Sequence, residues 1–300
     1  MARLFDAYIV VDWTAAEGKK TGDQTLWVGV VKRDARFRFA YESHNPATRS
    51  EGEQLLRTLL ADLAKKGQRV LLAFDFGLGL PRGTAKALGL AGEPWAALWK
   101  FMASNVVDKA DNTNNRFAVA AKMNRLMTNE ARPFWGAPAR FAQTWMSTTK
   151  PEGGYGDTPE FRLTEKAARK KGGKPAAVWQ MHGASTMGGQ TLLGMAMVKR
   201  LVDELGPSVA AWPFGTGWRA LGKDDVEPLS VLVAETHTPL FAGKAEPGEA
   251  RTAAAVRITA QALSRADEKD ELAALFAPPK GTSEKDVAAV QLEEGWMLGA

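Results

Sequence analysis

Short apolar runs that end at an acidic residue recur along the chain. Residues 7–13 (AYIVVDW) and 69–76 (RVLLAFDF) have the length and composition of buried β-strands, and each contains an aspartate near its end. Residues 25–32 and 37–43 are predicted to be two further strands that follow the first. Because the connections between the first three strands are short, the pattern predicts a three-stranded antiparallel meander.

A helix is predicted between the meander and the fourth strand. Ser50 and Glu53 have the spacing of a capping box, and the helix is expected to continue to Gly67. Its apolar face is formed by leucines at helical spacing, namely Leu55, Leu56, Leu59, Leu60 and Leu63. This helix would cross over the sheet, so the strand at 69–76 is expected to run parallel to the strand at 7–13.

The second half of the chain repeats this alternation after a segment of different composition. Residues 190–205 and 247–266 are predicted to be helices, and residues 209–214 and 229–235 are predicted to be strands. Residues 92–180 are richer in Trp, Asn and basic residues. We therefore predict an α/β fold with a mixed sheet flanked by helices, in which 1–91 and 181–300 form the core and 92–180 form an insertion.

Three acids close strand-like runs: Asp12, Asp75 and Glu235. The carboxyl ends of parallel strands lie at one edge of a sheet, and neighbouring strands are ~4.8 Å apart, so these carboxylates could converge. A further acid, Glu249, is expected at the start of the last long helix, whereas Asp267 would lie about 27 Å further along it. Such a set favours one or two Mg²⁺ or Mn²⁺ ions, which can activate water and orient a displacement at phosphorus.

Composition narrows the chemistry of the site. The chain has no cysteine, which excludes disulfides, thiolate nucleophiles and thiolate metal ligation. Its three histidines are widely separated in the sequence. The net charge of +5 is uneven, because residues 100–174 hold 14 Lys and Arg against 7 Asp and Glu, while the remainder of the chain is slightly acidic. A basic segment suits a phosphate-rich partner such as nucleic acid, and it is equally typical of a solvated surface.

Two groups of polar residues are candidates for phosphate contacts. Backbone amides ahead of the helix at 190–205 could bind a phosphate, although the segment lacks a Walker pattern. The phosphate-binding candidates are Thr14, Ser185 and Thr186, and the candidates for nucleic-acid binding are Asn115, Arg116, Lys122 and Arg125. The alternative for the first group is a structural turn, and for the second a solvated helix face.

No stretch of 18 apolar residues occurs, and Asp6 interrupts the apolar sequence near the N-terminus. We therefore expect no membrane partner and a cytoplasmic location. The sequence specifies no oligomeric state.

Several of these segments together resemble a known family. The chain is similar, over nearly its whole length, to the uncharacterised family of predicted RNase H-like nucleases, domain of unknown function family 429. The segments that carry the resemblance are VVDWT (10–14), AFDFGLGLP (73–81), 115–125, 133–138, 179–195, 211–214, 233–241 and 293–299. The resemblance implies an RNase H-like fold in which Asp12, Asp75 and Glu235 are the metal-binding acids.

Three functions remain open on the sequence. The strand-end acids and the basic segment favour a divalent-metal-dependent nuclease, with Asp12, Asp75, Glu235 and Glu249 as its catalytic acids. An ATP-dependent phosphotransferase of the actin or sugar-kinase type also begins with a meander that carries an acid. In a non-catalytic nucleic-acid-binding protein, the acids would be structural.

Overall fold

The computed structural model describes residues 3–34, 36, 38–183 and 186–300. Within these residues, seven strands form one mixed sheet in the order β3-β2-β1-β4-β6-β5, and β7 pairs with the end of β6. The strands are β1 (Ala7–Asp12), β2 (Trp27–Arg33), β3 (Phe39–His44), β4 (Val70–Phe74), β5 (Val209–Ala211), β6 (Val231–Thr236) and β7 (Met297–Leu298).

The pairing of the strands confirms the predicted mixture of directions. Strands β1, β2 and β3 form an antiparallel meander, and β4 lies beside β1 and parallel to it. Strand β6 is parallel to β4, and both β5 and β7 are parallel to β6. The carboxyl ends of β1, β4 and β6 therefore meet at one edge of the sheet.

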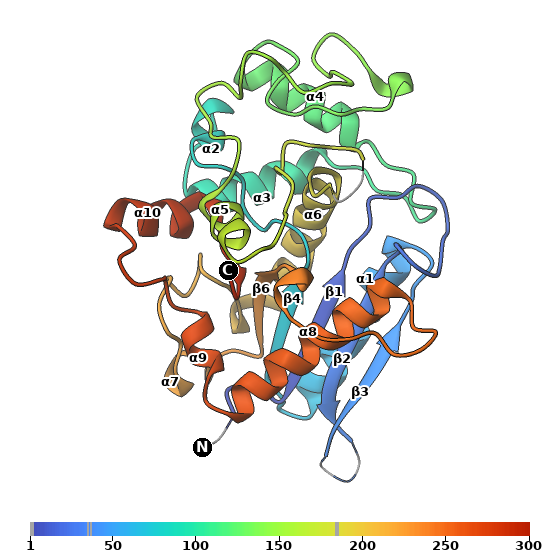
Figure 1. The fold of residues 1–300 in the computed structure, drawn as a ribbon, viewed down its shortest axis with the longest axis vertical. Helices are drawn as coiled ribbons and strands as arrows, with labels where there is room; N and C mark the ends of the chain where they lie inside the picture. The colour runs from blue at the N-terminus through green and yellow to red at the C-terminus, as the bar shows by residue number, and fades with distance from the viewer. Residues whose placement is uncertain (1–2, 35, 37, 184–185) are drawn as a thin grey trace.

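Helices cover both faces of this sheet (Figure 1). The α-helices are α1 (Arg49–Lys65), α2 (Thr84–Ala87), α3 (Pro94–Asn105), α4 (Arg116–Met127), α5 (Leu163–Lys170), α6 (Gly188–Leu205), α7 (Lys223–Val226), α8 (Arg251–Glu268), α9 (Leu272–Leu275) and α10 (Glu284–Ala289). Shorter helical turns are η1 (Ala139–Phe141), η2 (Gly206–Ser208), η3 (Thr238–Leu240) and η4 (Val290–Glu294). No helix in the described residues is long and apolar enough to cross a membrane.

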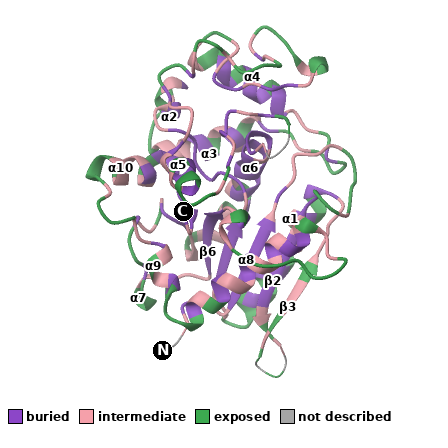
Figure 2. Ribbon diagram, viewed as in Figure 1, coloured by how far each residue is buried: buried purple, intermediate pink, exposed green. Residues whose placement is uncertain are grey.

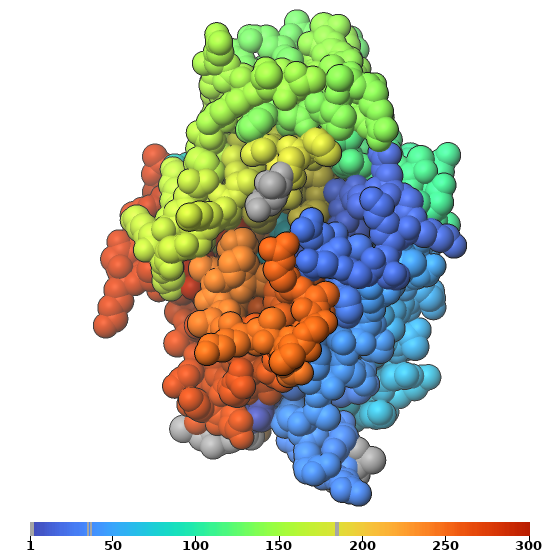
Figure 3. Space-filling model, turned by 45° about the vertical axis from the view of Figure 1, so that its right-hand side comes forward, coloured from blue at the N-terminus to red at the C-terminus, as the bar shows by residue number. Residues whose placement is uncertain are grey.

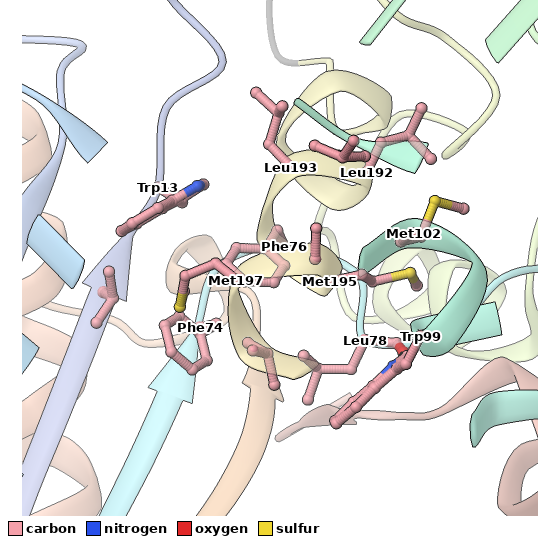
Figure 4. Packing of buried hydrophobic residues seen from close by; sticks show 14 of the residues in the cluster. Trp13, Phe74, Phe76, Leu78, Trp99, Met102, Leu192, Leu193, Met195 and Met197 are labelled. Atoms are coloured by element: carbon pink, nitrogen blue, oxygen red, sulfur yellow. The ribbon is translucent and has the colours of Figure 1, made fainter. Parts of the chain in front are cut away.

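The core has two layers because side chains of a strand alternate between its faces. Ile9 and Val11 belong to the cluster that includes the leucines of α1 and much of α6, whereas Tyr8 and Val10 belong to the cluster that includes the apolar side of α8. Strands β1, β2, β4 and β6 are accordingly buried along most of their length, whereas the edge strand β3 has no buried residue (Figure 2). Figure 4 shows how Trp13, Phe76 and Met197 meet where α6 packs over the ends of β1 and β4.

Residues 92–180 pack against α6 and belong to the same hydrophobic cluster as one face of the sheet. Helix α3 lies against α6, and Trp99 and Trp179 are almost fully buried in the cluster that contains Val11 and Leu72. This segment therefore shares its hydrophobic core with the sheet, and its division from the rest of the chain stays a prediction. Its buried tryptophans are packing residues.

Several element boundaries differ from the predictions. Thr48, not Ser50, caps α1, because the Thr48 hydroxyl accepts a hydrogen bond from the Glu51 amide at 3.1 Å. Helix α8 begins at Arg251, after the turn at Pro247 and Gly248, and the strand expected at 209–214 ends at residue 211. Residue 37, where the third strand was expected to begin, lies outside the described residues.

Candidate functional site

Asp12 and Asp75 lie side by side at the carboxyl ends of β1 and β4. Val11 pairs with Phe74 across the two strands, and the Asp75 amide donates to the Val11 carbonyl oxygen at 2.9 Å. The next residue on each strand is the aspartate, so the two side chains are level. By the alternation along each strand, both point to the face of the sheet that α8 covers. The structure thus brings two of the predicted acids together.

Glu235 is not part of this pair, and its predicted place among the metal ligands is corrected. Glu235 pairs with Phe74, so Thr236 is the β6 residue level with Asp75. Because side chains alternate, the Glu235 carboxylate points to the opposite face of the sheet. There it is fully buried and accepts two hydrogen bonds from Arg162, at 2.5 and 2.8 Å.

The Arg162 guanidinium organises a buried polar network. It binds the carboxylates of Glu165 and Glu235, and its Nη1 also donates to the backbone oxygens of Gly79 and Glu294 at 3.2 and 2.8 Å. Burial raises the pKa of Glu235, and the adjacent guanidinium opposes that rise. The network joins α5, β6, the loop after β4 and the C-terminal segment, so its role is to hold these elements in register.

Glu249 does not reach the acid pair either. It precedes α8, and its carboxylate binds the Arg257 guanidinium at 2.6 Å while accepting the Glu246 amide at 2.9 Å. Hydrogen bonds from Arg257 are the largest cause that lowers the pKa of Glu249. The expectation that Glu249 supplies a catalytic acid is corrected, because the helix starts two residues later and directs this carboxylate along its own side.

A cleft of about 990 Å³ opens above Asp12 and Asp75. Three segments form most of its walls: the loop after β1, the segment that leads into α6, and residues just after β6 and at the start of α8 (Figure 3). Arg116, Pro138 and Arg140 complete the lining. Its charged and polar lining includes Asp12, Thr14, Glu17, Lys20, Asp23, Asp75, Arg116, Arg140, His182, Gln190, His237, Thr238 and Arg251. The acid pair therefore lies in a cavity with cationic side chains around it.

The ionised forms of Asp12 and Asp75 repel each other because the two carboxylates are adjacent. Burial, the Asp75 charge and the Asp23 charge raise the pKa of Asp12 well above its usual range. Asp75 has local partners instead, because Thr238 donates its hydroxyl at 2.9 Å and the His237 Nδ1 lies 3.4 Å away. A cation between the carboxylates would relieve the repulsion that they exert on each other.

The loop after Asp12 is held in place by side chains from distant parts of the chain. Arg49 is buried and donates to the carbonyl oxygens of Thr14 and Ala16, at 3.2 and 2.8 Å. The Gln190 side chain donates to the Trp13 carbonyl oxygen at 2.6 Å, which ties the first turn of α6 to this loop. Hydrogen bonds from residues far away in the sequence therefore hold this wall of the cleft in place.

The predicted phosphate-binding residues have different environments. Thr14 lines the cleft, but its hydroxyl accepts the Ala16 amide at 3.1 Å. Thr186 also lines the cleft and donates to the Gly183 carbonyl oxygen at 3.1 Å. Ser185 lies outside the described residues. The segment before α6 thus faces the same cleft as the acid pair.

Of the predicted nucleic-acid contacts, Arg116 lines the cleft and the other three do not. The side-chain amide of Asn115 bonds the backbone of Asn105 and Val107, at 2.9 and 2.8 Å, and therefore has a structural role. Lys122 is exposed and donates to the Asn105 side chain at 2.5 Å, and Arg125 stacks on Trp145 at 4.7 Å from the ring centre.

Sequence reasoning missed five charged residues of the cleft, namely Glu17, Lys20, Asp23, Arg140 and Arg251. They come from loops, from η1 and from the start of α8, and no local motif marks them. Thr238 was also missed, although its position just after a strand that ends at this edge is a usable signal. The histidine beside it, His237, contacts Asp75.

The acid pair is a small ligand set. Within the described residues, no group of three or more His, Asp and Glu side chains is arranged to hold a metal ion. Mg²⁺ is commonly bound through one or two carboxylates and completes its shell with water and substrate phosphates. Two adjacent carboxylates in a cleft with cationic walls fit that mode of binding, and Asp12 and Asp75 are the residues that would hold the ion.

In the comparisons with known proteins, no family model, no curated protein and no solved structure matches this chain.

Proposed function

We propose that the chain is a divalent-metal-dependent hydrolase of phosphodiester bonds in nucleic acid, built on an RNase H-like sheet. The observation that carries the proposal is the level pair of Asp12 and Asp75 at the floor of a cleft whose walls include four cationic side chains, those of Lys20, Arg116, Arg140 and Arg251. Carboxylates favour a hard cation, and arginine and lysine favour phosphate oxygens. One cleft therefore offers both of the interactions that a phosphodiester substrate with its metal ion requires.

The architecture supports the proposal. An antiparallel meander, parallel strands beside it and flanking helices are the features expected of an RNase H-like sheet. The acid pair lies at the edge where open α/β sheets bind ligands. The sequence resemblance to predicted RNase H-like nucleases points the same way, with Asp12 and Asp75 in place of its acids.

In this proposal, the residues of the cleft have distinct tasks. Asp12 and Asp75 would hold Mg²⁺ or Mn²⁺, which when bound neutralises phosphate charge and lowers the pKa of a bound water. Thr238 fixes the orientation of the Asp75 carboxylate through its hydrogen bond. Lys20 and Arg251 line the cleft and would bind phosphate oxygens of the substrate. With two carboxylates rather than four, the site favours a single ion.

A nuclease screen with a matched pair of variants tests the proposal. Purified protein with Mg²⁺ or Mn²⁺ is incubated with single-stranded and double-stranded DNA, RNA and hybrids. We expect cleavage that Asp12→Asn and Asp75→Asn each reduce at least about a hundredfold, the scale of losing a charged group that stabilises the transition state. Glu249→Gln, which lies outside the cleft, should cleave at the wild-type rate. No cleavage of any substrate, or equal rates in all variants, would reject the proposal.

A second candidate function has one observation in its favour. Gly183, Thr186 and Gly189, which surround the start of α6, line the same cleft as Asp12. A nucleotide triphosphate could place its phosphates there with a metal ion on the acid pair, as in an ATP-dependent phosphotransferase. This alternative predicts ATP hydrolysis or phosphate transfer that depends on Asp12. The nuclease proposal predicts neither of these activities.

A further inference from the structure

The first turn of α6 opens into the cleft beside the acid pair. Helix α6 has 18 residues, and both Gly189 and Gln190 line the cleft. The amides of Gly188 and Thr191 donate to carbonyl oxygens at 3.1 and 2.8 Å. Within the residues that the structure describes, no acceptor takes the amide of Gly189 or Gln190. Both N–H groups lie at the positive end of a long helix, where an anion is stabilised.

A buried arginine lies against this turn. The Arg116 side chain is only 8% exposed, and its Nε has no hydrogen-bond partner among the residues that the structure describes. A Cβ atom on Gly189 would lie 3.2 Å from Cδ and 3.3 Å from Nε of Arg116, so glycine at this position makes room for the guanidinium. Within the described part of the chain this N–H donor is buried without an acceptor, an unfavourable arrangement that an anion bound at the helix terminus would relieve.

A carboxylate of the protein itself lies between Arg116 and Arg140. One oxygen of Glu17 lies 3.4 Å from the Arg116 guanidinium, and the other lies 3.2 Å from Arg140. Glu17 belongs to the loop after β1, and its side chain is 33% exposed. Both distances are longer than a strong charge-assisted hydrogen bond, which measures about 2.8 Å. Glu17 therefore balances two cations without saturating them.

We propose that the first turn of α6, Arg116 and Arg140 form an anion subsite for a phosphate group of the substrate, and that Glu17 pairs with the two arginines until that phosphate displaces it. The subsite lies beside the acid pair, because the Gln190 side chain bonds the Trp13 carbonyl oxygen, one residue after Asp12. It takes the phosphate that neighbours the one undergoing hydrolysis, and in this respect the inference rests on the proposed function.

The size of the cleft limits the substrate further. A volume of about 990 Å³ is at the upper end of pockets for small ligands, about 300–1,000 Å³. It can hold one or two nucleotides at a time. The part of the substrate that enters the cleft is therefore a short or terminal segment that is anchored by a second phosphate.

Titration of inorganic phosphate in the presence of EDTA tests the subsite without any divalent ion. The result is therefore independent of the metal-dependent activity, and phosphate binding without nuclease activity would reject only the proposed function. We expect saturable binding, a dissociation constant raised about tenfold or more in Arg140→Gln and Arg116→Gln, and tighter binding in Glu17→Gln. Arg200→Gln is the matched control, because Arg200 lies on α6 about 16 Å from its first turn and pairs with Glu53.

Arg140 and Glu17 carry the test if Arg116→Gln fails to fold, since the Arg140 side chain is 69% exposed and Glu17 is partly exposed. A second probe is a dinucleotide with and without a 5′-phosphate. Wild type should prefer the phosphorylated form, and Arg140→Gln should lose most of that preference. The inference is overturned if Glu17→Gln and Arg140→Gln bind phosphate like Arg200→Gln, if wild type shows no saturable binding, or if the two dinucleotides bind equally.

Discussion

Asp12 and Asp75 stand level with each other on neighbouring parallel strands, with both carboxylates on the face of the sheet that α8 covers. Two like charges in a partly buried position oppose folding unless they are neutralised. The pKa of Asp12 is accordingly raised, by burial first and by Asp75 second. Such a pair lowers the stability of the fold, as residues of functional sites often do.

Replacing Asp12 by Asn should therefore stabilise the protein at neutral pH. A carboxyl group whose pKa is raised by folding binds more protons in the native than in the unfolded state, so stability falls as pH rises from about 4 toward the raised pKa. Each unit of difference between the pKa values of the folded and unfolded states corresponds to about 1.4 kcal/mol in the free energy of unfolding. We expect a higher melting temperature for Asp12→Asn at pH 7, by roughly 2–4 °C per kcal/mol, and no difference below pH 4.

Substitution of Asp23 provides a control in which the melting temperature should change in the opposite direction. Its pKa is lowered, first by the hydrogen bond from the Thr252 amide, so its ionised form favours the folded state. Asp23→Asn should therefore lower the melting temperature slightly at pH 7, with the difference vanishing in acid. Thermal melts of both variants between pH 3 and 8 would contradict the interpretation if Asp12→Asn were the less stable of the two.

Divalent cations should bind at the acid pair. We expect calorimetric titration of Mn²⁺ or Mg²⁺ to show weak saturable binding in wild type, because two carboxylates supply only part of the shell. Binding should vanish in the Asp12→Asn, Asp75→Asn double variant and strengthen when phosphate is present. Glu249→Gln should bind the ions as wild type does. Equal binding in wild type and the double variant would place the ions elsewhere.

The Arg162 network predicts a different pattern, in which stability changes and cation binding does not. Arg162→Met leaves Glu165 and Glu235 buried without their counter-ion, so the free energy of unfolding should fall by about 3–5 kcal/mol. Adding Glu165→Gln and Glu235→Gln should recover much of this loss. Urea denaturation measures the effect, and a loss below about 1 kcal/mol in Arg162→Met would contradict it. Glu235→Gln alone should leave Mn²⁺ binding unchanged.

The contrast between Asp75 and Glu235 shows what the sequence can predict about this site. Both acids end an apolar run, and the runs themselves correctly predicted two parallel strands. Which face an acid points to depends on the register between β4 and β6, and that register is set by pairing across about 160 residues. A shift of one residue moves a side chain to the other face. The sequence alone does not specify that register.

Contacts between residues far apart in the sequence also explain which features of the fold and the cleft were predicted and which were missed. Meander, crossover helix and strand directions follow from local periodicity and short connections, and they were predicted correctly. Arg49 and Arg162 bind partners that are 59 and 73 residues away, and no local pattern marks such pairs. Even the cap of α1 was misplaced by two residues, because Thr48 and Ser50 each precede a glutamate at the required spacing.

The loop after Asp75 should tolerate no side chain at Gly79. A Cβ atom there would lie 2.2 Å from the Glu293 carbonyl oxygen and 2.4 Å from the Glu294 backbone. Backbone atoms cannot rotate away, and the Arg162 Nη1 also binds the Gly79 carbonyl oxygen at 3.2 Å. Gly79→Ala must therefore separate this loop from the C-terminal segment.

We expect Gly79→Ala to lower the free energy of unfolding by about 3 kcal/mol, the upper range for overpacking a core. Gly215→Ala is the matched control, since its Cβ would meet no atom closer than 3.7 Å, and it should change stability by less than about 0.5 kcal/mol. Urea denaturation compares the two. Because Leu78 in the same loop donates its amide to Glu235 at 2.8 Å, the Gly79 variant should also weaken the Arg162 network. Near-native stability in Gly79→Ala would show that the loop and the C-terminal segment are not in close contact.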